Sequence, residues 1–275
     1  MKELKKIRNK IDISKYKKDK SLLIHFFIHL FIFFGLMTFV MTSPDLHWII
    51  YLLLVIVVGN SMLVMSFAAH EMSHGGAGLR QGLISKVLIH LGWIGGVFTT
   101  STNQSVAHNR LHHIHTNKLN DPDRRVLQVE VAPYGKLAKL FSFFVPSHHY
   151  PKMTFLYGFS FLIFSYHNNL FWQTLLNSKQ IYDLRLNDKE KFKTSLEYLS
   201  NILVYLFIWS MSGFSLKGFI FISLSYFVVA WLSGFYIITN HLNCSLLEEG
   251  MDNFENTLKT TVSLKIPKWI DFLHL

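Results

Sequence analysis

The chain has 275 residues, of which 50% are hydrophobic, 15% aromatic and 16% charged, and its mean hydropathy is +0.27. Soluble domains average about 25% charged residues, so this composition excludes an ordinary cytosolic protein, and the high apolar content excludes an intrinsically disordered chain. The single cysteine, Cys244, excludes an internal disulfide framework and a cysteine-based zinc or iron–sulfur site.

Basic residues are concentrated at the start of the chain. The net charge is +10, and nine of the 27 Lys and Arg residues lie within the first 20 positions. A basic segment directly before an apolar run is typical of a membrane-flanking tail, which attracts anionic lipid headgroups. We therefore predict no nucleic-acid partner, a basic cytoplasmic tail at residues 1–20, and a single membrane domain at residues 21–275.

Four apolar runs are predicted to cross the membrane as helices. Residues 22–41 contain no charged side chain, are long enough for a hydrocarbon layer about 30 Å thick, and are not followed by a signal-peptide cleavage site. A short turn separates them from residues 48–69. Residues 198–216 and 218–239 form a second pair around a tight turn at Lys217. The predicted fold is an all-α, polytopic membrane protein with two helical hairpins.

A long stretch, residues 71–197, separates the two hairpins. Within it, residues 83–100 and 154–172 are apolar enough to lie in the membrane interface, but we do not expect them to cross. Lys and Arg are frequent in the tail and in this stretch, whereas the two short turns contain only Lys217. Because basic residues favour the cytoplasmic side, we expect both termini and a helical cap formed by this stretch to be cytoplasmic.

The chain contains 15 histidines, and two groups of them have a regular spacing. His70 and His74 stand four residues apart at the end of the second apolar run. His108 and His112 repeat this spacing in the middle stretch, and His113 follows directly. Residues four apart share one face of a helix, with about 5–6 Å between their Cβ atoms. Each pair can therefore hold a metal ion, or one edge of a two-metal site.

A further histidine, His241, ends the fourth apolar run, directly after Asn240. The predicted topology brings it to the same side of the membrane as the other two groups. Imidazole is a good ligand for iron, copper, zinc and nickel, and six convergent histidines exceed the three or four ligands of one zinc ion. Two metal ions fit this count better, and histidine-rich dinuclear iron at a membrane surface indicates dioxygen chemistry on a lipid.

These groups and the residues around them resemble the first and second histidine boxes of the integral-membrane fatty acid desaturases. The sequence reads HEMSH at residues 70–74 and HNRLHHIHTNKLNDPD at residues 108–123, and its HxxxHH form is most similar to the acyl-lipid and front-end branches. The resemblance extends from about the second apolar run to the C-terminus. It implies that the iron ligands are His70, His74, His108, His112, His113 and His241. It also implies that Asn240 holds a metal-bound water.

The resemblance implies O2-dependent removal of two hydrogens from a fatty acyl chain, in a membrane lipid or a carrier-linked form, at two iron ions. No catalytic residue is expected beyond the metal ligands. The sequence contains no HPGG haem-binding motif of a fused cytochrome b5 domain. The electrons are therefore expected from a separate donor of the ferredoxin or cytochrome b5 type.

The sequence departs from the family's pattern after the fourth run. The family carries a third box, HxxHH or QxxHH, whereas here the only histidine after His241 is His274. We expect a chain that is incomplete at its C-terminus, as a fragment or a truncated product, and that binds at least one iron poorly. Three alternatives to a desaturase stay open: a di-iron lipid hydroxylase, a zinc-dependent membrane lipid hydrolase or amidase with Glu71 as its acid/base, and a catalytically inactive truncated desaturase.

Two other sets of polar residues have simpler expected roles. His25 and His29 lie four apart in the first apolar run, where we expect them to face a neighbouring helix or to reach toward the interface. A solvated surface position is the simpler expectation for Glu71 and Asp121. The alternative for both carboxylates is that they orient the imidazole of a metal ligand.

Overall fold

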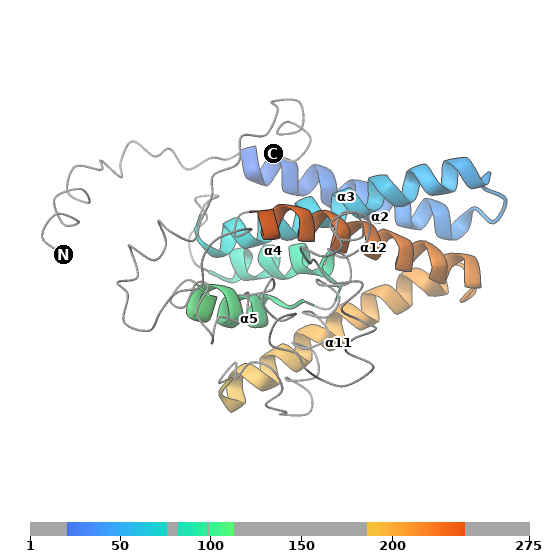
Figure 1. The fold of residues 1–275 in the computed structure, drawn as a ribbon. Helices are drawn as coiled ribbons and strands as arrows, with labels where there is room; N and C mark the ends of the chain where they lie inside the picture. The colour runs from blue at the N-terminus through green and yellow to red at the C-terminus, as the bar shows by residue number, and fades with distance from the viewer. Residues whose placement is uncertain (1–20, 76–81, 98, 113–185, 240–275) are drawn as a thin grey trace, which may run out of the picture.

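The computed structural model describes residues 21–75, 82–97, 99–112 and 186–239 (Figure 1). These residues form helices and the turns between them, without a strand, which confirms the all-α class. In chain order the helices are α2 (Ser21–Thr42), α3 (Trp48–Ser73), α4 (Leu83–Ile94), α5 (Ser101–Gln104), the π-helix η2 (Ser105–His112), α11 (Asp188–Ser210) and α12 (Leu216–Thr239).

Three helices in the described part of the chain are long and apolar enough to cross a membrane: α2, α3 and residues Leu216–Gly234 of α12. The first hairpin agrees closely with its predicted bounds, although α3 continues past the apolar run to Ser73. With 22 and 26 residues, α2 and α3 measure about 33 and 39 Å at a rise of about 1.5 Å per residue. The chain is therefore a membrane protein.

The predicted bounds of the third run, residues 198–216, were wrong at both ends. Asn187 starts α11 well before the apolar residues, because its side chain accepts the N–H of Glu190 while the Glu190 side chain accepts the N–H of Asn187. This reciprocal pair is a capping box. The helix ends at Ser210, before a turn in which Gly213 has a φ of 64°. With its charged first half, α11 is not among the three membrane-length apolar helices.

The two hairpin turns lie at the same end of the bundle (Figure 1). The Lys217 ammonium donates to the Pro44 carbonyl, and the Tyr51 hydroxyl donates to the Lys217 carbonyl over 2.7 Å. The C-terminal ends of α3 and α12 consequently lie at the opposite end. There the first histidine pair meets the segment that carries the second.

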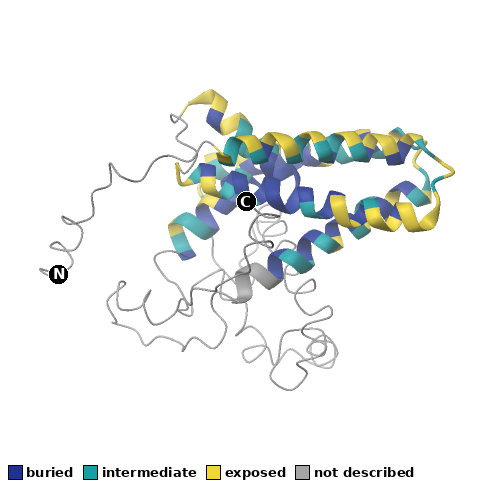
Figure 2. Ribbon diagram, turned by 90° about the horizontal axis from the view of Figure 1, so that it is seen from above, coloured by how far each residue is buried: buried dark blue, intermediate teal, exposed yellow. Residues whose placement is uncertain are grey.

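Close helix packing around α3 depends on glycine at two positions. A Cβ atom on Gly59 would lie 2.6 Å from the Cβ of Val228, so glycine lets α12 approach α3. A Cβ atom on Gly92 would lie 2.7 Å from the Met65 carbonyl oxygen, so glycine also lets α4 approach. Figure 2 shows that buried residues gather where these helices meet, and that exposed residues cover the outward faces of the bundle.

The structure also tests two further predictions, one for the apolar residues 83–100 and one for His29. Residues 83–100 do not form a crossing helix, because α4 has only 12 residues, or about 18 Å of length, and it packs on α3. His29 faces α3 as predicted, with 3.1 Å between its Nδ1 and the Ser61 hydroxyl. The predicted interfacial segment at residues 154–172 lies outside the described residues.

Candidate metal centre

The first histidine pair lies where α3 ends. His70 is in the last turn and His74 is the C-cap, whose backbone N–H bonds to the carbonyls of Glu71 and Met72. Gly75 follows with a φ of 81°, a left-handed conformation that suits glycine and ends the helix. The Nε2 atoms of His70 and His74 are 3.3 Å apart. The sequence spacing therefore places both imidazoles on one face, as predicted.

The second histidine pair lies on η2, whose backbone is a π-helix. A π-helix has a wider turn, with hydrogen bonds to the fifth residue along the chain. The rings of His108 and His112 are nevertheless stacked, with 4.9 Å between their centroids and 20° between their planes. His112 is buried, whereas His108 is half-buried and faces α3.

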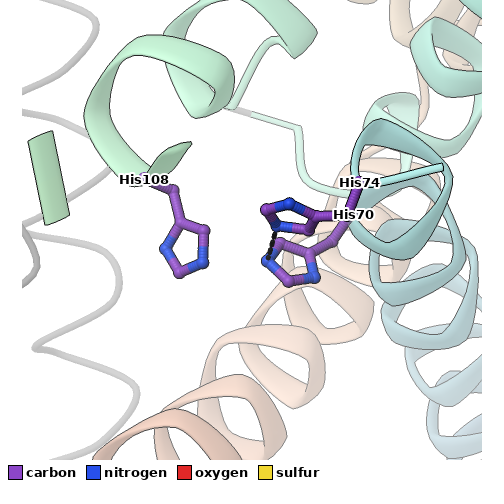
Figure 3. Close-up of side chains that lie close together, drawn as sticks. All are labelled: His70, His74 and His108. Carbon is purple, nitrogen blue, oxygen red and sulfur yellow. Dashed lines mark hydrogen bonds between the residues drawn. The ribbon is translucent and has the colours of Figure 1, made fainter. Parts of the chain in front are cut away.

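Three histidines from these two helices converge on one point (Figure 3). One ring nitrogen each from His70, His74 and His108 lies within 4.8 Å of the other two. Nitrogen ligands at about 2.1 Å from one metal ion, with angles of about 90–110°, lie about 3.0–3.4 Å from each other. The 3.3 Å between the first two Nε2 atoms falls in this range. The donor set therefore fits a transition metal that prefers imidazole.

Glu71 fixes the orientation of the His70 ring. Its carboxylate oxygen lies 3.0 Å from Nδ1 of His70. A carboxylate only accepts hydrogen bonds, so Nδ1 carries the proton and Nε2 presents its lone pair toward the other histidines. A carboxylate behind a ligand imidazole commonly supports metal sites in this way. Glu71 therefore contacts the His70 ring although most of its side chain is solvated, so both expectations for this residue hold.

His74 is held in the protonation state that binds metals. Partial desolvation, together with the neighbouring His70 and His108, lowers its pKa below the usual value for histidine. The imidazole is therefore neutral near neutral pH, with a lone pair available on one nitrogen. Metal binding at this position requires no prior loss of a positive charge.

Two contacts that the sequence did not single out tie η2 to its neighbours α3 and α11. Asn109 donates through Nδ2 to the Ser73 hydroxyl over 3.4 Å, and that hydroxyl donates to the carbonyl of His70 over 2.6 Å. Arg110 joins η2 to α11 through Glu190, with N–O distances of 2.9 and 3.4 Å. The only feature of the sequence that could have pointed to Ser73 and Asn109 is that each lies within a histidine group.

Part of the predicted site lies outside the described residues, namely His113, Asn240 and His241, as does Asp121. The helix that leads to the last pair is described, and it runs parallel to α3. Tyr51 packs against Phe221 near the start of both helices, with 5.2 Å between ring centroids, and Gly59 meets Val228 further along. Because both helices rise equally per residue, this register brings Thr239 level with His70.

The model of a family described as fatty acid desaturase matches residues 46–275, which include α3, both histidine groups and α12. No curated protein and no solved structure matches the chain.

Proposed function

The chain belongs to the fatty acid desaturase family, and from that premise we propose that it catalyses O2-dependent, di-iron desaturation of a fatty acyl chain. The family match and the membrane-length helices indicate a membrane oxidoreductase of the desaturase kind that acts on fatty acyl lipids. The observation that most directly supports the proposed iron chemistry is the convergence of His70, His74 and His108 from two helices. The acyl chain would be held in a membrane lipid or linked to a carrier.

The proposed reaction balances with an external electron donor. Two hydrogen atoms leave adjacent carbons of the acyl chain, one O2 is reduced, and two electrons and two protons enter to give two waters. When bound, the two iron ions supply O2 activation and the oxidising power for breaking unactivated C–H bonds. The histidine imidazoles would hold the metals, and Glu71 would keep the His70 ring in place.

We assign six iron ligands, of which three converge in the described part of the chain. The complete proposed set is His70, His74, His108, His112, His113 and His241. The stacking of His112 on His108 supports its inclusion, and the register of α12 against α3 supports the inclusion of His241. Asn240 would hold a metal-bound water.

The proposed arrangement in the membrane follows from charge. Both termini and the histidine groups would face the cytoplasm, because the basic residues are concentrated in the tail and the middle stretch. We further propose that residues 1–20 form a tail separate from the membrane domain at residues 21–275. A separate ferredoxin or cytochrome b5 type donor would deliver electrons on the cytoplasmic side. A reporter fused after Leu275 should read cytoplasmic, and an external reading would contradict this topology.

One observation favours a second candidate, a zinc-dependent lipid hydrolase or amidase. Three histidine ligands and a nearby carboxylate are the usual donor set of a catalytic zinc site. Glu71 would have to activate a zinc-bound water, but its carboxylate is already hydrogen-bonded to Nδ1 of His70. This bond favours a supporting role for Glu71, and therefore the desaturase.

The test is to measure metal content and lipid products on the same preparation. The full chain is purified in detergent, its iron and zinc are quantified, and lipids from the producing cells are analysed for new double bonds and hydroxyl groups. We expect iron and new double bonds, both lost in His108→Ala. The control is His47→Ala, an exposed histidine at the other end of the bundle. Zinc with lipid cleavage, iron with hydroxylated lipid, or no metal would each refute the proposal.

A further inference from the structure

Four polar residues on one face of α11 are buried, although its apolar side chains on the other faces are exposed. Thr194, Glu197, Tyr198 and Asn201 stand three or four residues apart and so share one face, and their exposed fractions are only 0, 8, 2 and 1%. The exposed apolar side chains of the same helix are Phe192, Leu196, Leu199, Ile202, Leu203, Leu206 and Phe207. A face of this kind needs polar partners inside the protein, because a buried polar group without one is costly.

Those partners lie in the segment between α4 and η2. Asn201 donates from Nδ2 to the carbonyls of Val97 and Thr99, each over 3.3 Å. Val97 has a φ of 53°, a left-handed conformation that a β-branched residue rarely adopts without support. One turn earlier on α11, the Tyr198 hydroxyl accepts a hydrogen bond from Nδ2 of Asn103 over 2.9 Å. The buried face of α11 therefore holds this segment at both of its ends.

Glu197 lies at the centre of this face and makes the most contacts. One carboxylate oxygen accepts from the hydroxyls of Ser101 and Thr102 at 2.6 and 2.9 Å. The other accepts from the backbone N–H of Thr102 at 2.9 Å. Lys193, one turn away on α11, places its ammonium 3.6 Å from the first oxygen. The carboxylate is thus buried with both oxygens satisfied and one cation nearby, as a buried charge requires.

The residues that Glu197 holds lead directly into the second histidine group. Ser101–Gln104 forms α5, and η2 begins at the next residue. The N–H of Ser105 bonds to the carbonyls of Ser101 and Thr102, so the position of these two residues sets the start of η2. His108 lies less than one turn further along the same continuous helix. Movement of the Ser101–Thr102 backbone would therefore move the His108 ring relative to His70.

We propose that Glu197 is a positioning residue for the second histidine group, and that it acts through Ser101 and Thr102 to keep His108 within reach of His70 and His74. It contacts none of these histidines in the described structure and would not itself bind a metal. The inference rests on the proposed function in so far as the histidines form a metal site. It adds that the affinity of this site is set in part from α11, a helix without any of the six proposed ligands.

The substitution Glu197→Gln separates geometry from charge. A glutamine of the same shape can accept from the Thr102 N–H with its oxygen, and its amide can donate to the two hydroxyls, which accept as well as donate. Glu197→Ala removes every one of these bonds. Ile208→Ala is the control for simple loss of stability, because Ile208 is buried on the same helix, near the hairpin turn at the far end.

The experiment titrates each purified full-length variant with Co2+ and records its visible absorption spectrum. We expect Glu197→Ala to lower Co2+ affinity about tenfold, as loss of a supporting residue commonly does, and to change the ligand-field bands. Glu197→Gln should restore both to near wild-type. Ile208→Ala should lower the unfolding temperature but leave affinity and spectrum unchanged. Wild-type affinity in Glu197→Ala, or an equal loss of affinity in Ile208→Ala, would overturn the inference.

Amide hydrogen exchange adds a measurement that does not depend on metal. The peptide covering Ser105–His112 should exchange faster in Glu197→Ala than in wild type, and Glu197→Gln should restore its protection. Unchanged exchange in Glu197→Ala would contradict the positioning role. A wild-type protein that binds Co2+ but forms no double bond refutes the proposed function and leaves this inference standing. A wild-type protein that binds no Co2+ overturns both.

Discussion

Removal of the Glu71 carboxylate should weaken metal binding at the histidine site by about tenfold. Residues that hydrogen-bond to a metal ligand typically contribute about 10–100-fold to affinity, which corresponds to about 1.4–2.7 kcal/mol. The structure places Glu71 at the lower end of this range. Its side chain is 56% exposed, so water can replace part of the lost hydrogen bond to His70 Nδ1. We therefore expect a loss of about 1.4 kcal/mol for Glu71→Ala.

Glu71→Gln tests whether orientation or charge carries this effect. Glutamine retains an oxygen that accepts from His70 Nδ1, so the ring keeps its tautomer and direction while the negative charge is lost. Because the charge is largely exposed to water, its loss should matter little. We expect Glu71→Gln to bind Co2+ within about threefold of wild type, a difference of about 0.6 kcal/mol.

The assay is competition for Co2+ between the purified protein and a chromogenic chelator at a pH of about 7.5, where unperturbed imidazole is neutral. Asp188→Ala is the control, because it removes an exposed carboxylate from the start of α11 without contact to the histidines. The reasoning is refuted if Glu71→Ala binds Co2+ as tightly as wild type. It is also refuted if Glu71→Gln loses as much affinity as Glu71→Ala.

Two further predictions concern stability, measured by unfolding in detergent. Gly59→Ala should destabilise the protein by about 1–3 kcal/mol, since its new Cβ overlaps α12; Gly35→Ala, with no atom within 4 Å of the new Cβ, should be neutral or stabilising. Equal changes in the free energy of unfolding for the two substitutions would refute the close approach of α12 to α3 at Gly59. Burial lowers the pKa of His90, so the unfolded chain takes up more protons below a pH of about 6.5 and stability falls. His90→Gln, which does not titrate, should show a smaller loss between pH of about 7.5 and 5.5; an equal loss would contradict this.

The first hairpin and the first histidine pair were predictable from sequence because local rules determine them. An uncharged run long enough to cross a bilayer predicts a helix with little regard to its partners, and α2 follows that prediction closely. His70 and His74 share a face of α3 because a four-residue spacing places them there. The Glu71 contact follows from the same turn of helix, and its side chain is also solvated, as the sequence favoured, with 56% of it exposed.

The bounds of α11 were not predictable by the same means, because tertiary contacts determine its exposure. A hydropathy window averages the two faces of a helix, and here the charged residues of the first half of α11 and the buried Glu197 reduce the average. The prediction therefore began at Tyr198, partway along the helix. The useful signal was the period of the polar residues together with the capping box of Asn187 and Glu190. A stripe of polar residues between apolar positions indicates a buried face when those residues find polar partners inside the protein.

The second histidine group shows that a four-residue spacing pairs two rings in more than one type of helix. In an α-helix, a residue four positions on lies about 40° past a full turn, and in a π-helix it lies about 33° short of one. His112 therefore stays beside His108 in either geometry, and the two rings stack in η2. The four-residue spacing of His108 and His112 therefore predicts neighbouring rings whichever of the two helix types forms.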